Sequence, residues 1–179
     1  EPKAWKPKLM NINELLNIGS ETLKKNKISS HLIDSELLLS KTIKKSREYI
    51  LINFEQKIEK KNIAKYKKYI SRRSQNEPIA YILGEKEFWS KKFMVNRNTL
   101  IPRPETELLI ETLFKTFVGK KISILDIGTG SGCIIISLLS ELKSSNGVGI
   151  DISKNAIKIA KKNGNFHKLN KRLKLINKP

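Results

Sequence analysis

The spacing of apolar residues predicts a small bundle of helices over residues 11–76. Apolar side chains recur every three to five positions, which places them on one face of a helix. The pattern separates into two helices before residue 40, a short third helix at 47–52 and a longer fourth helix that ends near residue 70. Ser29 and Ser30 precede the second helix and offer it an N-cap hydroxyl. The apolar positions are Leu15, Leu16, Ile18, Leu23, Leu32, Ile33, Leu37, Leu38, Leu39, Ile58, Ile63, Tyr66 and Ile70.

The pattern changes at Pro78, because proline disfavours a helical conformation in the residue before it. Residues 85–95 are rich in aromatic residues and alternate in polarity, which indicates a short hairpin or an extended linker. Pro104 then suits the first turn of a helix, and Glu105 and Glu107 follow where the helix dipole favours anions. We expect a helix from there to about residue 117. Its expected buried residues are Leu108, Leu109, Leu113 and Phe114.

The last third of the chain alternates between strand and helix. Strands are predicted at 122–125, 148–150 and 173–176, with helices at 133–141 and 154–163 between them. Strands separated by helices imply right-handed crossovers and a parallel sheet. Doubly wound sheets commonly have about five or more strands, so three strands correspond to the first half of such a fold.

Composition narrows the class of protein. With 39% apolar residues, the 179-residue chain can bury a core. No apolar run approaches the roughly 18 to 20 residues that a membrane-spanning helix needs, and residues 1–8 lack a signal-peptide segment. We therefore expect a soluble, cytoplasmic protein. A single cysteine, Cys133, and two histidines, His31 and His167, exclude an intrachain disulfide and make zinc or a catalytic metal centre unexpected.

The net charge of +19 would normally suggest a nucleic-acid partner. Only six of the 36 basic residues are arginine, however, and the 30 lysines are spread along almost every segment. An AT-rich coding bias would produce the same composition. Nucleic-acid contacts favour the guanidinium fork of arginine. We therefore interpret the lysines as solvated surface, and we do not expect specific nucleic-acid binding.

A glycine-rich turn at 126–132 is the strongest functional signal. Alternate glycines allow a tight turn, and they let a ligand approach the exposed backbone N–H groups at a helix N-terminus. The turn opens with Asp126, and the next strand ends about 25 residues later in Asp151. A carboxylate at that position can accept hydrogen bonds from ribose hydroxyls. The predicted ligand contacts are Asp126, Gly128, Thr129, Gly130, Ser131, Gly132 and Asp151.

The spacing of the glycines favours one class of nucleotide-like ligand. The third glycine of a dinucleotide fingerprint would fall on Cys133, and no Lys-Ser or Lys-Thr pair follows Gly132 as a Walker loop requires. The remaining pattern, acid-x-Gly-x-Gly-x-Gly, is typical of folds that bind S-adenosylmethionine. Asp126 would then receive the ammonium group of the ligand. A purely structural glycine turn stays open as an alternative.

Four segments together resemble the HemK/PrmC family, the N5-glutamine methyltransferases of peptide-chain release factors. They are 77–84 (EPIAYILG), 87–90 (EFWS), 100–107 (LIPRPETE) and 126–132 (DIGTGSG). The resemblance extends from about residue 10 to about residue 176. It implies an α + α/β fold: an N-terminal helical bundle, a hairpin linker and the first half of a class I (Rossmann-like) S-adenosylmethionine-dependent methyltransferase domain.

The resemblance also divides the chain into four parts. Residues 1–10 are a leader or an added tail, 11–76 a helical substrate-recognition domain, 77–102 a linker with a hairpin, and 103–179 a partial class I methyltransferase domain. The implied cofactor is S-adenosylmethionine, and the implied partners are release factors, methylated on the glutamine of their Gly-Gly-Gln loop. Because the family places the hairpin near the cofactor, Phe88 is a further candidate for a cofactor-proximal residue. Arg103 and Thr106 are candidates near the methionine end of the ligand.

The sequence departs from the family at the acceptor site. The family motif Asn-Pro-Pro-Tyr does not occur in the chain, and no acidic residue follows the third strand. No residue is identified as a catalytic acid or base. We therefore expect an incomplete copy that is inactive alone. Two alternatives stay open: a methyltransferase of amino groups in nucleic acid, and a non-catalytic fragment that binds a partner through its helices.

Overall fold

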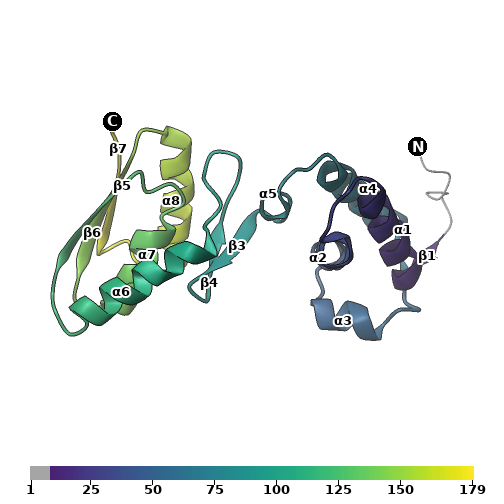
Figure 1. Cartoon of the computed structure of the whole chain (residues 1–179), viewed down its shortest axis with the longest axis horizontal. Coiled ribbons are helices and arrows are strands. Elements are labelled where there is room, and N and C mark those ends of the chain that lie inside the picture. Colours follow the sequence, from purple (N-terminus) through teal and green to yellow (C-terminus); the bar gives the residue numbers. More distant parts are fainter. Residues whose placement is uncertain (1–8) are drawn as a thin grey trace. The chain divides into compact units, whose positions relative to one another are not determined.

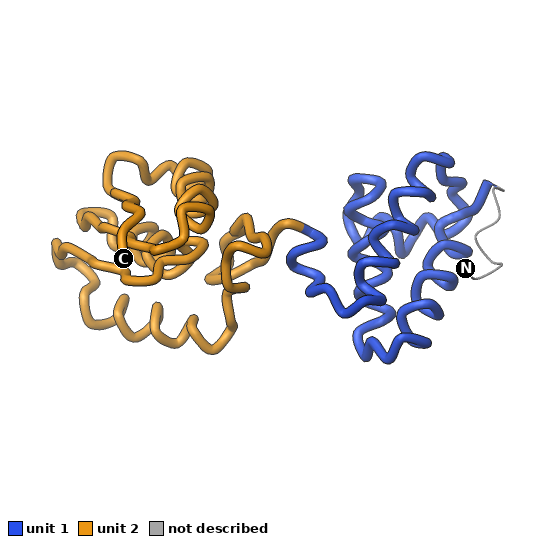
Figure 2. Tube along the Cα trace, turned by 90° about the horizontal axis from the view of Figure 1, so that it is seen from above, with its two compact units in different colours: residues 1–83 blue, residues 84–179 orange. Residues whose placement is uncertain are grey.

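The structure is a computed structural model that describes residues 9–179. The chain forms two compact units that divide between Leu83 and Gly84 (Figure 2). Residues 1–8, most of the expected leader, lie outside the described residues, whereas Met10 is buried in the first unit. The expected linker contributes to both units, because its first helix packs with the first unit and its hairpin belongs to the second.

The first unit is the helical bundle that the apolar spacing predicts (Figure 1). The third helix has the predicted bounds, but Ile58 does not belong to the fourth helix. It lies in a two-residue strand and pairs with Met10, 48 residues earlier in the chain. The elements are β1 (Met10–Asn11), α1 (Ile12–Lys25), α2 (His31–Ile43), α3 (Arg47–Ile52), β2 (Lys57–Ile58), α4 (Lys60–Ser74) and α5 (Ile79–Leu83).

Two helix starts in this unit use side chains in different ways. Asn11 and Glu14 form a reciprocal capping box at α1, with hydrogen bonds of 2.8 and 2.9 Å. Ser30 occupies the N-cap position of α2, as predicted, but its side chain accepts no backbone hydrogen bond. Its ψ of 20° departs from the extended conformation of a capping residue. The hydroxyl donates instead to Asp34 at 2.8 Å.

A close approach between α1 and α4 fixes the core of the first unit. The Tyr66 side chain is fully buried, and its hydroxyl lies 2.6 Å from the Ser35 hydroxyl of α2. A Cβ atom at Gly19 would lie only 2.1 Å from the Tyr66 hydroxyl oxygen. The contact therefore requires glycine at this position of α1.

The second unit begins with a hairpin and continues with alternating helices and strands. Its three long strands form a sheet in the order β5-β6-β7, and both strand pairs are parallel, as predicted. The elements are β3 (Glu85–Phe88), β4 (Lys91–Met94), η1 (Pro104–Thr106), α6 (Glu107–Phe117), β5 (Ser123–Ile127), α7 (Cys133–Glu141), β6 (Asn146–Asp151), α8 (Lys154–Phe166) and β7 (Leu173–Asn177).

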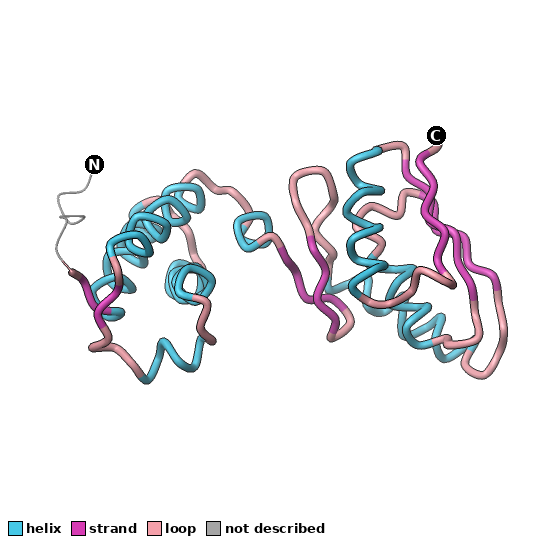
Figure 3. Tube along the Cα trace, turned by 180° about the vertical axis from the view of Figure 1, so that it is seen from behind, coloured by secondary structure: helices cyan, strands magenta, loops and turns pink. Residues whose placement is uncertain are grey.

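One face of the sheet packs against helices (Figure 3). Helix α7 contacts β5 and β6, and α8 contacts β6 and β7. Gly147 lies on the helix side, where a Cβ atom would approach Ile135 of α7 to 2.7 Å. Along β5, Leu125 is 59% exposed and Ile127 is 79% exposed. Apolar side chains on the opposite face of β5 are thus open in the described residues.

The structure corrects the predicted buried face of α6. Leu108 and Leu109 are exposed, whereas Ile110 is fully buried, and Leu113 packs partly against the same cluster. Three consecutive apolar residues cannot share one face, because neighbouring residues of a helix point about 100° apart. The prediction was therefore wrong for the first two leucines.

A two-residue turn joins β3 to β4 and uses unusual backbone angles. Trp89 and Ser90 have φ values of 52° and 50°, in the left-handed region that asparagine and glycine normally occupy in such hairpins. The Trp89 backbone N–H donates to Glu107 at 2.8 Å, and its indole N–H donates to Glu141 at 3.1 Å. These two bonds fix the turn against the start of α6 and the end of α7.

Candidate functional site

The glycine turn connects β5 to α7 at the carboxyl end of the sheet. Strand β5 extends to Ile127, two residues beyond the predicted end. Gly128, Gly130 and Gly132 all have positive φ, at 76°, 56° and 79°. The N–H groups of Gly128 and Thr129 both donate to the carbonyl of Ile150 in β6, at 2.8 and 2.9 Å. The turn is therefore held against the end of the neighbouring strand.

Open space lies beside two of these glycines. A Cβ atom at Gly128 would meet no heavy atom within 4 Å, and at Gly130 it would meet only the Gly128 carbonyl oxygen at 3.9 Å. At Gly132, by contrast, a Cβ atom would approach the Ile136 side chain to 2.9 Å. The first two glycines thus border a space that a side chain would fill, and the third allows the helix to pack.

Asp151 ends β6 and contacts the glycine turn directly. Its Oδ2 atom accepts a hydrogen bond from the Gly130 N–H at 2.9 Å, and its Oδ1 atom accepts one from the Ser153 N–H at 2.8 Å. A carboxylate has about four acceptor positions. Each oxygen of Asp151 can therefore accept one more hydrogen bond in a fixed orientation.

Asp126 supplies a second carboxylate on the neighbouring strand. Its Oδ2 atom accepts a hydrogen bond from the Thr129 hydroxyl at 2.7 Å. Burial raises the pKa of Asp126, and the negative charge of Asp151 adds to this rise, whereas the Thr129 hydrogen bond opposes it. The pair of carboxylates favours a ligand that is positively charged and carries hydrogen-bond donors.

The structure brings seven of the ten predicted residues together and leaves three apart from them. Phe88 is only 1% exposed and packs edge-on against Phe93, with ring centroids 6.1 Å apart. Arg103 is exposed at the start of η1, and Thr106 precedes α6. Within residues 9–179, none of these three side chains forms a hydrogen bond to the turn, and their role near a cofactor stays a prediction.

One residue at the turn was missed by the sequence analysis. Asn163 of α8 is fully buried, and its side-chain amide donates to the Ser131 carbonyl at 2.9 Å. The available signal was its position on a helix face that is otherwise apolar or small, with Ala156 and Ala160. A polar side chain at such a position needs buried partners, but the sequence does not reveal which ones.

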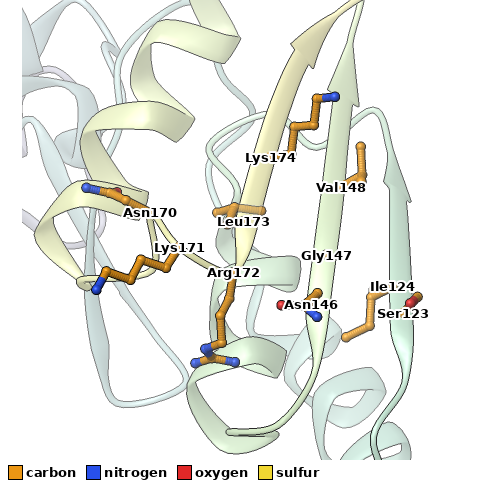
Figure 4. Close-up of a pocket in the computed structure, with 10 residues that line it drawn as sticks. All are labelled: Ser123, Ile124, Asn146, Gly147, Val148, Asn170, Lys171, Arg172, Leu173 and Lys174. Atoms are coloured by element: carbon orange, nitrogen blue, oxygen red, sulfur yellow. The ribbon is translucent and has the colours of Figure 1, made fainter.

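A separate cavity of about 310 Å³ lies at the opposite, amino-terminal edge of the sheet (Figure 4). Among its lining residues, the Arg172 guanidinium donates to the carbonyls of Leu139, Leu142 and Ser145 at the end of α7. Ligands of open α/β sheets bind beyond the carboxyl ends of the strands. The cavity is therefore not part of the candidate site.

Two further features concern the described residues only. Over residues 9–179, no three His, Cys, Asp or Glu side chains are grouped so that they could hold a metal ion. In the same range, no helix has the length and apolar character to cross a membrane.

Known families match both units of the chain. A family described as the PrmC N-terminal domain matches residues 14–84, and one described as a methyltransferase domain matches residues 119–177. The second match contains the glycine turn and both carboxylates. The two matches thus fall on separate sides of the hairpin.

Curated relatives of the chain are also methyltransferases. A release factor glutamine methyltransferase of Buchnera aphidicola is 44% identical over 155 residues, which cover 87% of this chain and 56% of the relative. One from Leptospira interrogans is 42% identical and covers 83% and 53%. A bifunctional methyltransferase of Rickettsia conorii is 37% identical and covers 92% and 36%.

The chain spans between about one third and just over half of the length of these relatives. The two family matches cover residues 14–84 and 119–177, and the relatives above 40% identity cover 83% to 89% of the chain. Residues 14–84 thus match a PrmC N-terminal domain, and the chain is similar to release factor glutamine methyltransferases.

Proposed function

We propose that the glycine turn and its two carboxylates bind S-adenosylmethionine. The observation that carries this proposal is the placement of Asp126 and Asp151 on adjacent parallel strands, on either side of a turn that has open space at Gly128 and Gly130. The ligand carries an ammonium group and two ribose hydroxyls, and two partly buried carboxylates are suitable acceptors for both. The residues therefore fit this cofactor.

Each residue has a distinct part in this arrangement. Asp151 accepts the ribose hydroxyls through the acceptor positions that Gly130 and Ser153 leave free. Asp126 attracts the ammonium group, and the Thr129 hydroxyl holds its carboxylate in place. When bound, the cofactor supplies a methyl group activated by a positively charged sulfur. The protein contributes mainly by positioning the reactants.

The proposed reaction is methylation of the glutamine side-chain amide in the Gly-Gly-Gln loop of release factors. Support comes from the relatives named release factor glutamine methyltransferase, at 41% to 44% identity. The sequence contains no Asn-Pro-Pro-Tyr motif, so we assign to these 179 residues the binding of the methyl donor. The helices of the first unit are proposed to recognise the release factor.

A matched pair of glycine variants tests the cofactor site. Gly130→Val places a branched side chain in the space beside the turn and should abolish binding of S-adenosylmethionine in a calorimetric titration. Gly119→Val is the control, because Gly119 also has a positive φ, of 77°, and open space around it, but lies after α6. The control should bind as the unmodified chain does. Normal binding by the Gly130 variant would refute the proposed site.

A further inference from the structure

Asn163 makes three hydrogen bonds to two segments that are distant in sequence. Its Oδ1 atom accepts from the Met94 N–H at 2.7 Å, and its Nδ2 atom donates to the Met94 carbonyl at 3.0 Å. The same Nδ2 atom donates to the Ser131 carbonyl at 2.9 Å. The side chain is fully buried. One amide therefore joins the end of the hairpin to the middle of the glycine turn.

The bond to Ser131 acts on the part of the turn that contacts Asp151. Ser131 follows Gly130, whose N–H donates to the Asp151 carboxylate. The Ser131 carbonyl shares its planar peptide group with the Gly132 N–H, which donates to the Thr129 carbonyl at 2.7 Å. A rotation of the Ser131 carbonyl would therefore break the hydrogen bond that closes the turn around Gly130. Asn163 thus fixes the peptide group whose N–H closes the turn around Gly130.

The hairpin provides a rigid partner for this amide. Its turn is bound to Glu107 and Glu141 through Trp89, at 2.8 and 3.1 Å. The carbonyl of Lys92 in β4 lies 2.8 Å from the Nε2 atom of His167, the C-cap residue of α8, one turn after Asn163. The backbone at Met94 is therefore held independently of the glycine turn.

We propose that Asn163 is a positioning residue of the methyl-donor site, which couples the docked hairpin to the glycine turn. The inference rests on the proposed function, because it assumes that the turn binds S-adenosylmethionine. Asn163 itself touches no ligand in this account. It holds Ser131 so that Gly130 and Asp151 keep the arrangement that the cofactor needs.

The substitution Asn163→Asp removes the N–H donors of the side chain and keeps its oxygen acceptor. The carboxylate keeps an acceptor for the Met94 N–H, but when ionised it brings negative charge against the Met94 and Ser131 carbonyls. Burial raises the pKa of such a carboxyl group, so the protonated form, which regains one donor, should return at acid pH. Asn163→Leu has a similar shape and offers no hydrogen bond at any pH.

The experiment compares cofactor affinity at pH 8 and pH 5.5 for the unmodified chain, Asn163→Asp, Asn163→Leu and the control Asn165→Asp. Asn165 lies on the exposed side of the same helix, so its substitution matches the charge change. We expect Asn163→Asp to bind at least tenfold more weakly than the control at pH 8 and within about threefold of it at pH 5.5. Asn163→Leu should stay weak at both pH values.

Amide resonances provide a readout that does not depend on the cofactor. The Gly130 and Gly132 signals of Asn163→Asp should shift between pH 5.5 and 8 relative to those of the control.

If Asn163→Asp unfolds at pH 8, protonated Asn163→Asp should still bind better than Asn163→Leu at pH 5.5. Affinities equal to the control at both pH values, or glycine signals that follow the control, would overturn the inference. If the unmodified chain fails to bind, the proposed function fails, and the glycine signals still decide the role of Asn163.

Discussion

Asp126 illustrates how a site residue can oppose stability. Burial raises its pKa above the ordinary value of an aspartate, with a further contribution from the charge of Asp151. A group whose pKa is higher in the folded state favours folding most when it is protonated. Its contribution is present below the unfolded pKa and is lost as the pH rises through the folded pKa. At neutral pH, the ionised carboxylate therefore lowers the free energy of unfolding.

The first prediction is that Asp126→Asn stabilises the chain at neutral pH while it weakens cofactor binding. Asparagine is uncharged and keeps an oxygen acceptor for the Thr129 hydroxyl. Urea denaturation from pH 3 to pH 8 should show a higher midpoint for the variant at pH 7, with the difference shrinking as the pH falls. Glu111→Gln, which removes a half-exposed carboxylate that pairs with Lys115, is the control. A lower midpoint for Asp126→Asn at pH 7 would contradict the burial argument.

At the scale of elements, the hairpin turn of the second unit places two consecutive non-glycine residues in the left-handed region. A non-glycine residue in the left-handed region costs about 1 to 2 kcal/mol. Glycine removes this cost, but it also makes the unfolded chain more flexible. The added entropy of the unfolded chain lowers the free energy of unfolding by about 0.4 to 1 kcal/mol. The relief exceeds the entropy, so an exposed position in the turn gains from glycine.

The second prediction is that Ser90→Gly raises the free energy of unfolding by about 0.5 to 1 kcal/mol. The Ser90 side chain is exposed, and its φ is 50°. Thermal denaturation followed by circular dichroism measures the change. Ser90→Ala should give no gain, because alanine keeps the Cβ atom that causes the strain. Equal stabilisation by both variants would show that the backbone angle is not responsible.

The third prediction concerns the packing of α1 on α4. Alanine normally stabilises a helix interior relative to glycine by about 0.5 to 1 kcal/mol. Gly19→Ala should instead destabilise the first unit by about 1 to 3 kcal/mol, because the new methyl group would overlap the Tyr66 hydroxyl. Chemical denaturation of the single variants and the double variant with Tyr66→Phe forms a cycle. The double variant should recover part of the loss, and a stabilising Gly19→Ala would contradict the contact.

Elements with strong local patterns were predictable from the sequence. The helices at 47–52 and 133–141 have the predicted bounds, and the order of strands and helices in the second unit is as expected. These features depend on periodicity and on local turn residues. Ile58 was placed wrongly because its partner, Met10, is distant in sequence.

The part of the candidate site that depends on local sequence patterns was also predictable. The glycine spacing and the carboxylate at a strand end are local signals, and they located Asp126, Asp151 and the turn between them. The bond from Gly130 to Asp151 depends on the strand register. The partners of Asn163 lie 69 and 32 residues away in the chain, so no local pattern contains them.

At the scale of the whole molecule, the residues proposed to bind the cofactor all lie in the second unit, between β5 and β6. The first unit contributes a separate core of buried residues and contains none of them. The chain thus contains a proposed methyl-donor site and a separate set of helices proposed for partner recognition. Above all, we propose that Asp151 and the glycine turn hold the ribose end of S-adenosylmethionine.

The most direct test of this claim removes the Asp151 carboxylate in one arm and the ribose hydroxyls of the ligand in the other. Calorimetric titrations compare the unmodified chain and Asp151→Ala, each with S-adenosylhomocysteine and with its 2′,3′-dideoxy analogue. Hydrogen bonds to a charged group contribute about 1.5 to 3 kcal/mol, so Asp151→Ala should lose more than tenfold in affinity for the parent ligand. For the dideoxy analogue, the unmodified chain and the variant should bind with nearly equal, weak affinities. Equal losses for both ligands, or no loss for either, would contradict the claim that Asp151 holds the ribose hydroxyls.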